Sequence, residues 1–523
     1  MATWQKFISF VAGYWILERI SQQFPHCKQL INQEQGQKFG GKYRHWVMIF
    51  LLGFVIAPAF TYLEQYPVVM DIQDAVGIDW LMRATQQNIP SAQAKKIPQF
   101  VWLDIDDKTH EKWGEPLFTP RNRIERLIDT AVKAQARLII VDIDLSRPTP
   151  IEGLEKYNIK RHPYDKSLAN YFATYPAYCK TQPKCPPIIL ARTFLNGSND
   201  TTKLPPFKQP RLAFPELKQA VIDSDAHIQW AAPQFQLSRD SVLRRRLNWQ
   251  ATCTGEQPGV VASVEVMVAV LLNSETPKQA QDIINKALAP LKPDCTGAQS
   301  KQPPKEIEIG SLKLSTDPLS VRQRIVFSMP WLIADPNTGK PEPWIMLKDE
   351  TDNFSIVRRL PIYNLQNMPP EHLKKEHVEG GIVIIGGSHS DGRDYHQTPL
   401  GSMPGALVLI NSTHSILEYE QIEPLPNWLK WLIIAVLISV MAWIFIYVGS
   451  FWLAQILNLL IIGSMMFVSV FLFRSSGLWL DFATPLIFVQ LYQIAIFLVL
   501  ALLCLLLSVG QWLRQLNFWS PKL

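Results

Sequence analysis

The sequence predicts an α/β domain with a parallel-sheet core, joined to four transmembrane α-helices, one before the domain and three after it. Short apolar runs typical of buried strands predict the sheet, and a segment with helical spacing lies between two of these runs. Four long apolar stretches predict the transmembrane helices, in a chain of 523 residues that is 47% hydrophobic.

The membrane topology follows from these stretches and from the charges beside the first of them. Each stretch has close to the roughly 20 apolar residues that cross a hydrocarbon core. Basic residues outnumber acidic residues before the first stretch, so the positive-inside rule places the N-terminus in the cytoplasm. We expect a cytoplasmic segment at residues 1–45, a first span at 46–63 and an outer domain at 64–425. Three further spans follow at 428–447, 451–473 and 482–509, and a cytoplasmic tail at 510–523 ends the chain.

The first elements expected in the outer domain form a strand, helix, strand unit. The apolar run and aromatic content of residues 100–106, FVWLDID, predict a buried strand. Residues 119–136 begin with Thr-Pro and carry apolar residues at helical spacing, which predicts a helix. Residues 137–146, RLIIVDIDLS, predict a second strand. This unit is typical of a right-handed crossover that joins a pair of parallel strands.

Later segments of the outer domain add to this sheet. Residues 186–192, PPIILAR, predict a third strand, and residues 381–387, GIVIIGG, predict a late strand that rejoins the sheet. The apolar residues 259–273 predict a core helix. Residues 195–215 and 292–305 are dense in Pro, Lys, Thr and Gln, which indicates surface insertions.

Four cysteines fall in the predicted outer domain, where oxidising conditions favour disulfides. None of them has the spacing of a metal site. We expect Cys179 to pair with Cys185 because the two bracket one short loop, which leaves Cys253 to pair with Cys295. The two other pairings are the alternatives.

Six segments, taken in order, are similar to a known family. They are VWLDIDDKT at 101–109, G-x-P-x-x-x-P-R at 114–121, IIVDIDLS at 139–146, GIVIIGG at 381–387, DYHQTPLG at 394–401 and PGALVLINSTHSIL at 404–417. The chain resembles the type-2 CHASE family, extracytoplasmic sensory domains associated with cyclases and histidine kinases. The resemblance covers residues 64–510, and the three predicted spans after the domain also match the family.

The resemblance implies a sensor in a bacterial inner membrane, with its large domain periplasmic or extracellular and both termini cytoplasmic. Chains of the family commonly continue into an output domain, whereas this one stops shortly after its fourth predicted span. We therefore expect a separate cyclase, kinase or other output protein as partner, an unknown extracytoplasmic ligand, no cofactor and no enzymatic activity. A homodimer stays open, and the net charge of +6, partly located in residues 1–45, calls for no nucleic-acid partner.

The residues that we expect to bind the ligand lie at the ends of the predicted strands. In open α/β sheets, ligands bind outside the carboxyl ends of the strands. A set of carboxylates follows the first two strands, an arginine can neutralise part of their charge, and a polar turn follows the late strand. The candidates are Asp104, Asp106, Asp107, Arg121, Asp142, Asp144, Asp394, His396 and Thr398.

Two other functions stay open at this stage. Asp104 and Asp106 have the D-x-D spacing that begins haloacid dehalogenase-like phosphohydrolases, although Thr109 comes one place late and an outer-face location is unusual for such an enzyme. A structural or interaction subunit of a membrane complex is the other alternative. The turn at 386–401 contains histidines and aspartates, but their spacing is not that of known zinc sites, and we expect no metal.

Overall fold

The computed structural model describes isolated positions between 62 and 75, and then residues 77–84, 97–151, 161–195 except 183, 208–295, 303–334, 340–348 except 345, 355–365, 378–422, 426–447 and 451–476. The chain forms two compact units. The larger unit consists of residues 79–424 and 470–479, and the other of residues 1–78, 425–469 and 480–523.

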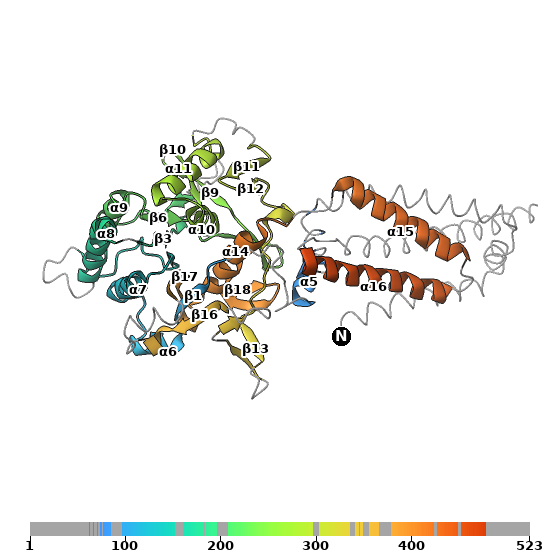
Figure 1. Cartoon of the computed structure of the whole chain (residues 1–523), viewed down its shortest axis with the longest axis horizontal. Coiled ribbons are helices and arrows are strands. Elements are labelled where there is room, and N and C mark those ends of the chain that lie inside the picture. Colours follow the sequence, from blue (N-terminus) through green and yellow to red (C-terminus); the bar gives the residue numbers. More distant parts are fainter. Residues whose placement is uncertain are drawn as a thin grey trace, which may run out of the picture. The chain divides into compact units, whose positions relative to one another are not determined.

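The larger unit is built on a seven-stranded sheet of order β15-β16-β1-β17-β2-β3-β6 (Figure 1). Six neighbouring strands, β16 to β6 in this order, are parallel, and β15 pairs antiparallel with β16 at the edge. In sheet order the strands span Met346–Lys348, Ser355–Pro361, Phe100–Ile105, Ile382–Gly387, Leu138–Val141, Ile188–Ala191 and Ile228–Ala231. The predicted α/β domain with a parallel-sheet core is confirmed.

Both faces of this sheet are covered, which explains why the central strands are continuous apolar runs. Side chains of β1, β17 and β2 pack on one face against α7, Arg121–Lys133, α8, Pro163–Thr181, and α9, Pro215–Ile222. On the other face lie α10, Val264–Leu272, and α14, Gly405–Tyr419, which are themselves almost completely buried. Because side chains alternate along a strand, Asp104 and Asp142 project on the opposite face from Leu103 and Val141.

Short helices and hairpins complete the larger unit. The helices are α5, Ile78–Ala84, α6, Asp107–Lys112, α11, Pro277–Leu288, and α12, Ile362–Leu365, with 3-10 turns η2, Ala289–Leu291, η3, Val321–Gln323, and η5, Ser390–Gly392. The hairpins pair β4, Phe194–Leu195, with β5, Gln209–Pro210; β7, Phe235–Leu237, with β8, Leu243–Arg246; β9, Trp249–Thr254, with β10, Gln257–Ala262; β11, Glu306–Ile309, with β12, Leu312–Ser315; β13, Leu332–Ala334, with β14, Pro341–Pro343; and β18, Tyr395–Thr398, with β19, Gly401–Pro404.

One expectation for the sheet is wrong, and the start of one expected helix is wrong. The first two predicted strands do not pair, because β17 lies between β1 and β2 and pairs with both. The predicted core helix at 259–273 begins as strand β10, and the helix α10 starts only after Ser263, whose hydroxyl accepts from the amide of Val266. An apolar run rich in valine fits a strand as well as a buried helix, so periodicity alone does not place this boundary.

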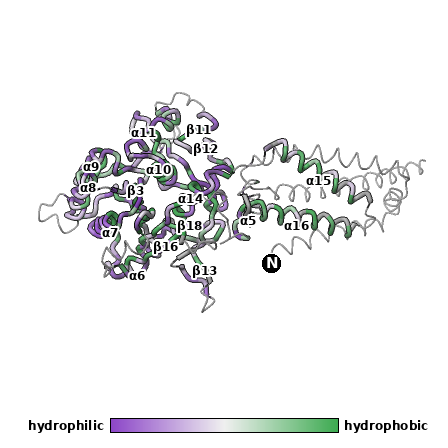
Figure 2. Tube along the Cα trace, in the orientation of Figure 1, coloured by the Kyte–Doolittle hydropathy of each residue, from purple (hydrophilic) through white to green (hydrophobic). Residues whose placement is uncertain are grey.

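The smaller unit contains α15, Asn427–Tyr447, and most of α16, Phe451–Ser476, at the positions of the second and third predicted spans. Both helices are coloured mainly as hydrophobic in Figure 2. Within the part of the chain that the structure describes, no helix combines the length and apolar character needed to cross a membrane. The first predicted span, apart from Tyr62, and the fourth lie outside the described residues, as do the cytoplasmic segment and the tail.

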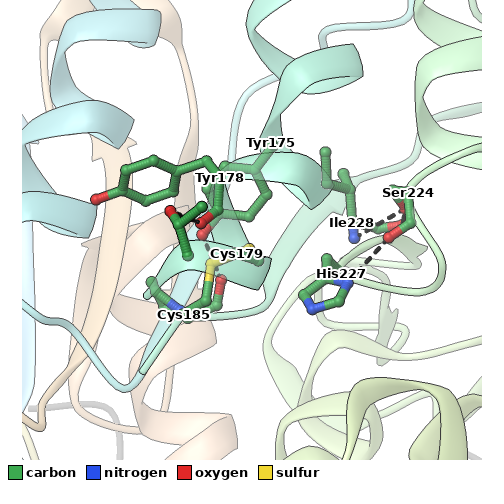
Figure 3. Close-up of a disulfide and its surroundings, with 9 residues drawn as sticks. Tyr175, Tyr178, Cys179, Cys185, Ser224, His227 and Ile228 are labelled. Carbon is green, nitrogen blue, oxygen red and sulfur yellow. Dashed lines mark hydrogen bonds between the residues drawn. A yellow bond between two sulfur atoms is a disulfide. The ribbon is translucent and has the colours of Figure 1, made fainter. Parts of the chain in front are cut away.

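Both disulfides of the predicted pairing are present in the larger unit. Cys179 in the last turn of α8 is bonded to Cys185, and the Cα atoms are 5.2 Å apart (Figure 3). The hydroxyl of Tyr175 donates to the carbonyl of Pro186 over 2.7 Å beside this disulfide. The bond therefore fixes the short connection from α8 to β3.

Candidate functional site

The parallel strands β16, β1, β17, β2, β3 and β6 all end at one edge of the sheet, which we call the carboxyl edge. Ligands of open α/β sheets bind outside such an edge. All the candidate residues from the sequence belong to this edge or to the loops and hairpin beside it, except Arg121 at the start of α7. A candidate side chain is available to a ligand only if its polar atoms are not already bonded to other residues of the protein.

Asp104 is fully buried near the end of β1 and is held by two donors. Its Oδ2 accepts from Arg359 Nε over 2.6 Å and from Ser388 Oγ over 2.8 Å. Its Oδ1 has no hydrogen-bond partner in the described part of the chain. Burial raises the pKa of Asp104 to about 6, and the charge of Arg359 acts in the opposite direction. The carboxyl group therefore belongs to the interior of the domain.

Arg359 on β16 also belongs to this edge, although no motif in the sequence selects it. It lies opposite Trp102 in the parallel pairing of β16 with β1. Its guanidinium is 5.1 Å from the ring centre of Trp331 and 5.9 Å from that of Trp102, within range of cation–π attraction. The only sequence signal was an arginine pair in a short β-rich segment, VRRLP. The aromatic rings and Asp104 together enclose a positive charge.

Asp106 and Asp107 are engaged by neighbouring loops. Asp106 is the N-cap of α6, and its Oδ1 accepts from the amide and the hydroxyl of Thr109 at 2.9 and 2.5 Å. Asp107 Oδ1 accepts from the amide and the hydroxyl of Ser390 at 2.7 and 2.9 Å. Both carboxylates thus stabilise the chain where β1 and β17 end.

Asp144 and Arg121 organise the loop after β2 without pairing their side chains by a hydrogen bond. Asp144 accepts from the amide of Ser146 over 2.9 Å and from Thr193 Oγ1 over 3.0 Å. Arg121 Nη2 donates to the carbonyl of Asp144 over 2.9 Å. The Nε of Arg121 lies 3.9 Å from Oδ1 of Asp165 on α8, a buried carboxylate that the sequence analysis missed. Arg121 therefore stabilises the backbone of the loop after β2.

Asp142, Asp394 and His396 form the one group of candidates that interact mainly with each other. His396 Nε2 lies 2.9 Å from Asp394 Oδ1, and this hydrogen bond raises the pKa of His396. Burial raises the pKa of Asp142 to about 7, the negative charges of Asp394 and Glu265 add to the shift, and His396 opposes it. In this group two carboxylates therefore lie with one histidine.

This group lies at the N-terminus of α14. The amide of Gly405 donates to the carbonyl of Asp394 over 2.8 Å, and the Asp394 carboxylate occupies the place where a side chain at Gly405 would begin. A Cβ on Gly386 would lie 2.8 Å from the Cβ of Ala406, so the helix and β17 approach each other at this point. This group therefore lies against the start of α14.

Two further side chains of the polar turn, Thr398 and His389, make contacts within the domain. Thr398 is buried, and its hydroxyl donates to the carbonyl of Gly401 over 2.7 Å across the β18–β19 hairpin. His389 stacks on His110 with ring centres 4.4 Å apart. Among the residues that the structure describes, no three His, Cys, Asp or Glu side chains are grouped so that they could hold a metal ion.

Comparison with known proteins gives one match. The family model described as CHASE2 domain matches residues 48–447, which is well over half of the chain. The resemblance that the sequence motifs indicate is confirmed. Neither the curated proteins nor the solved structures contain a match to this chain.

Proposed function

We propose, on the premise that this chain belongs to the CHASE2 domain family, that it is a membrane-anchored sensor. CHASE2 domains are extracellular sensory domains. In this proposal an extracytoplasmic ligand or partner binds at the carboxyl edge, and the change is passed to a separate output protein such as a cyclase or kinase.

The contact between the carboxyl edge and α14 is the observation that carries this proposal. Asp394 abuts the first residue of α14, and Ala406 in its first turn packs on β17. In the chain, α14 ends at Tyr419 and α15 begins at Asn427, so few residues separate the two helices. A ligand that favours one arrangement of the edge would shift the equilibrium of α14 by its difference in affinity for the two states.

Membrane anchoring is the second part of the proposal. The apolar stretches and the basic residues 1–45 support four spans, with residues 64–425 outside a bacterial inner membrane and both termini in the cytoplasm. Alkaline phosphatase fused after residue 300 should then be active, and the same enzyme fused after residue 523 should be inactive. The reverse pattern would overturn this topology.

Signalling is tested by finding the output protein and perturbing the edge. Cross-linking the full-length chain in native membranes should enrich one cyclase, kinase or similar protein, whose activity is then compared between variants. Asp394→Ala should abolish the response, because it removes the carboxylate at the start of α14. The control is Asp391→Ala, an exposed residue of the same turn. If both variants respond like the natural chain, the edge is structural and the sensing surface lies elsewhere.

The burial of Asp104 leaves the phosphohydrolase reading without support. A nucleophilic aspartate must reach the phosphorus of its substrate, whereas Asp104 is enclosed and bonded to Arg359 and Ser388. No catalytic reaction is therefore part of the proposal. A structural or interaction subunit remains as the outcome if cross-linking recovers only proteins without signalling activity.

A further inference from the structure

The end of the carboxyl edge formed by β3 and β6 differs in charge from the rest. Arg192 follows β3, and its amide donates to the carbonyl of Ala231 over 2.8 Å, which fixes it beside the end of β6. Its guanidinium lies over the ring of Trp230, 5.5 Å from the ring centre. Its Nε is buried and has no hydrogen-bond partner in the described part of the chain.

Two more cations belong to the hairpin that leaves β3 at this point. The amide of Arg211 donates to the carbonyl of Thr193 over 2.9 Å, so Arg211 lies across the hairpin from the residue after Arg192. Its Nε is likewise buried without a partner among the described residues. Lys208 Nζ donates to Gln234 Oε1 over 3.1 Å, and Gln234 is three residues past the end of β6. The three cations therefore belong to segments that lie beside the ends of β3 and β6.

No carboxylate neutralises these cations in the part of the chain that the structure describes. The nearest acidic residue in the hydrogen-bond network is Asp144, whose carboxylate is already engaged by Ser146 and Thr193. Burial lowers the pKa of Arg192 and of Lys208, and no acidic neighbour acts in the opposite direction. Partly buried cations without counter-charge attract an anion from solution.

The structure assigns an oxyanion site to this end of the carboxyl edge: we propose that Arg192, Arg211 and Lys208 bind a carboxylate or phosphate group of the sensed ligand. The assignment rests on the proposed function, because it names the chemical class of the ligand that the sensor takes. Arginine suits this role, since its planar guanidinium donates two parallel hydrogen bonds to a carboxylate or phosphate. The ring of Trp230 packs against the Arg192 guanidinium and positions it at the end of β3.

The test uses the full-length chain in detergent with two probes, inorganic phosphate and succinate, at constant ionic strength set with sodium chloride. A ligand that binds only the folded state raises the unfolding midpoint in proportion to its occupancy. At least one probe should raise the midpoint in a saturable manner, and the probe that does so identifies phosphate or carboxylate as the group. Arg192→Gln should weaken the apparent affinity at least tenfold, since it removes the bidentate donor.

Two variants keep the result interpretable. Lys208→Gln alters a partly exposed side chain and should weaken binding by a smaller factor, even if Arg192→Gln folds poorly. Arg137→Gln is the control, because Arg137 is exposed and donates to the carbonyl of Leu272 away from these strand ends. An equal rise with chloride alone, or equal effects of all three variants, would overturn the oxyanion site.

The site and the sensor function fail in different ways. If phosphate or succinate binds through Arg192 but the activity of the output protein never changes, the site stands and the sensor function is wrong. If neither probe binds while Asp394→Ala still abolishes the response, the sensor function stands and the oxyanion site is wrong.

Discussion

The carboxyl edge has two halves with opposite charge, and they differ in how their charges are satisfied. In the acidic half, at β1, β17 and β2, most carboxylates accept hydrogen bonds from the protein itself, as Asp104 does from Arg359. In the basic half, at β3 and β6, no acidic neighbour among the described residues acts on Arg192 or Lys208. The half that is richer in candidate residues is therefore the less available to a ligand.

The difference has a physical origin in the reach of the side chains. A short Asp side chain after a strand accepts from amides and hydroxyls of its own loop, as Asp106 and Asp144 do. An arginine has no such local acceptor and must find a carboxylate or carbonyl from elsewhere in the fold. Charged residues in the sequence thus indicate where the carboxyl edge lies. Only the hydrogen-bond partners of each side chain show which charged groups remain available to a ligand.

The largest expected effect is in the acidic half. Arg359→Leu leaves Asp104 buried without its cation, and breaking a buried pair in this way costs about 3–5 kcal/mol. Urea unfolding of the full-length chain measures the loss. Replacing both residues, with Asp104→Asn and Arg359→Leu together, should recover part of it. A loss below about 1 kcal/mol in the single variant would show that the acidic half is as loosely held as the basic half.

The pH dependence of stability should also come from the acidic half. In the folded chain the pKa of Asp142 is raised to about 7 and that of Asp104 to about 6, from an ordinary value of 3.8. The folded state therefore keeps protons that the unfolded state has released, and stability from these groups falls as the pH rises from about 4 to about 7.

The matched variant for this pH effect is Asp142→Asn, which cannot titrate. After a discount for partial exposure, we expect it to remove up to about 2 kcal/mol of the pH-dependent loss and to leave the part due to Asp104. Thermal unfolding at several pH values between 4 and 7.5 measures the slope. An unchanged slope would mean that Asp142 titrates in solution-like surroundings.

A smaller effect is expected where a carboxylate caps a helix. Asp106→Ala removes the N-cap of α6 and should cost about 1 kcal/mol. Asp106→Asn keeps an acceptor for the amide of Thr109 and should cost much less. Equal losses in the two variants would show that the negative charge, and not the cap, is what matters at this position.

The smallest effect is expected in the basic half. Arg192→Gln removes a charge that no carboxylate in the described part of the chain balances. Without added anion, the free energy of unfolding of this variant should therefore differ from that of the natural chain by less than about 0.5 kcal/mol. Urea unfolding under the same conditions as for Arg359→Leu measures it. A loss above about 1 kcal/mol would erase the contrast between the two halves.

The sequence by itself determined the local features of this protein. Continuous apolar runs predict strands of a parallel sheet covered on both faces, and β1, β2, β3 and β17 all occur where such runs were found. The helical spacing of residues 119–136 predicts α7. Six motifs in order indicate the family, and the family model confirms it. Each strand, helix and motif is itself shorter than about 20 residues, the range over which periodicity and turn chemistry act.

The tertiary structure alone decided which distant segments meet. It placed β17 between β1 and β2, although β17 follows β2 by more than 200 residues. It paired Asp104 with Arg359, which are 255 positions apart, and it brought Lys208 to Gln234 beside the end of β6. These contacts depend on strand order and on which faces bury together, and hydrophobic periodicity carries no information about either. Strand order also decides which charges find partners, so the basic half became visible only in the fold.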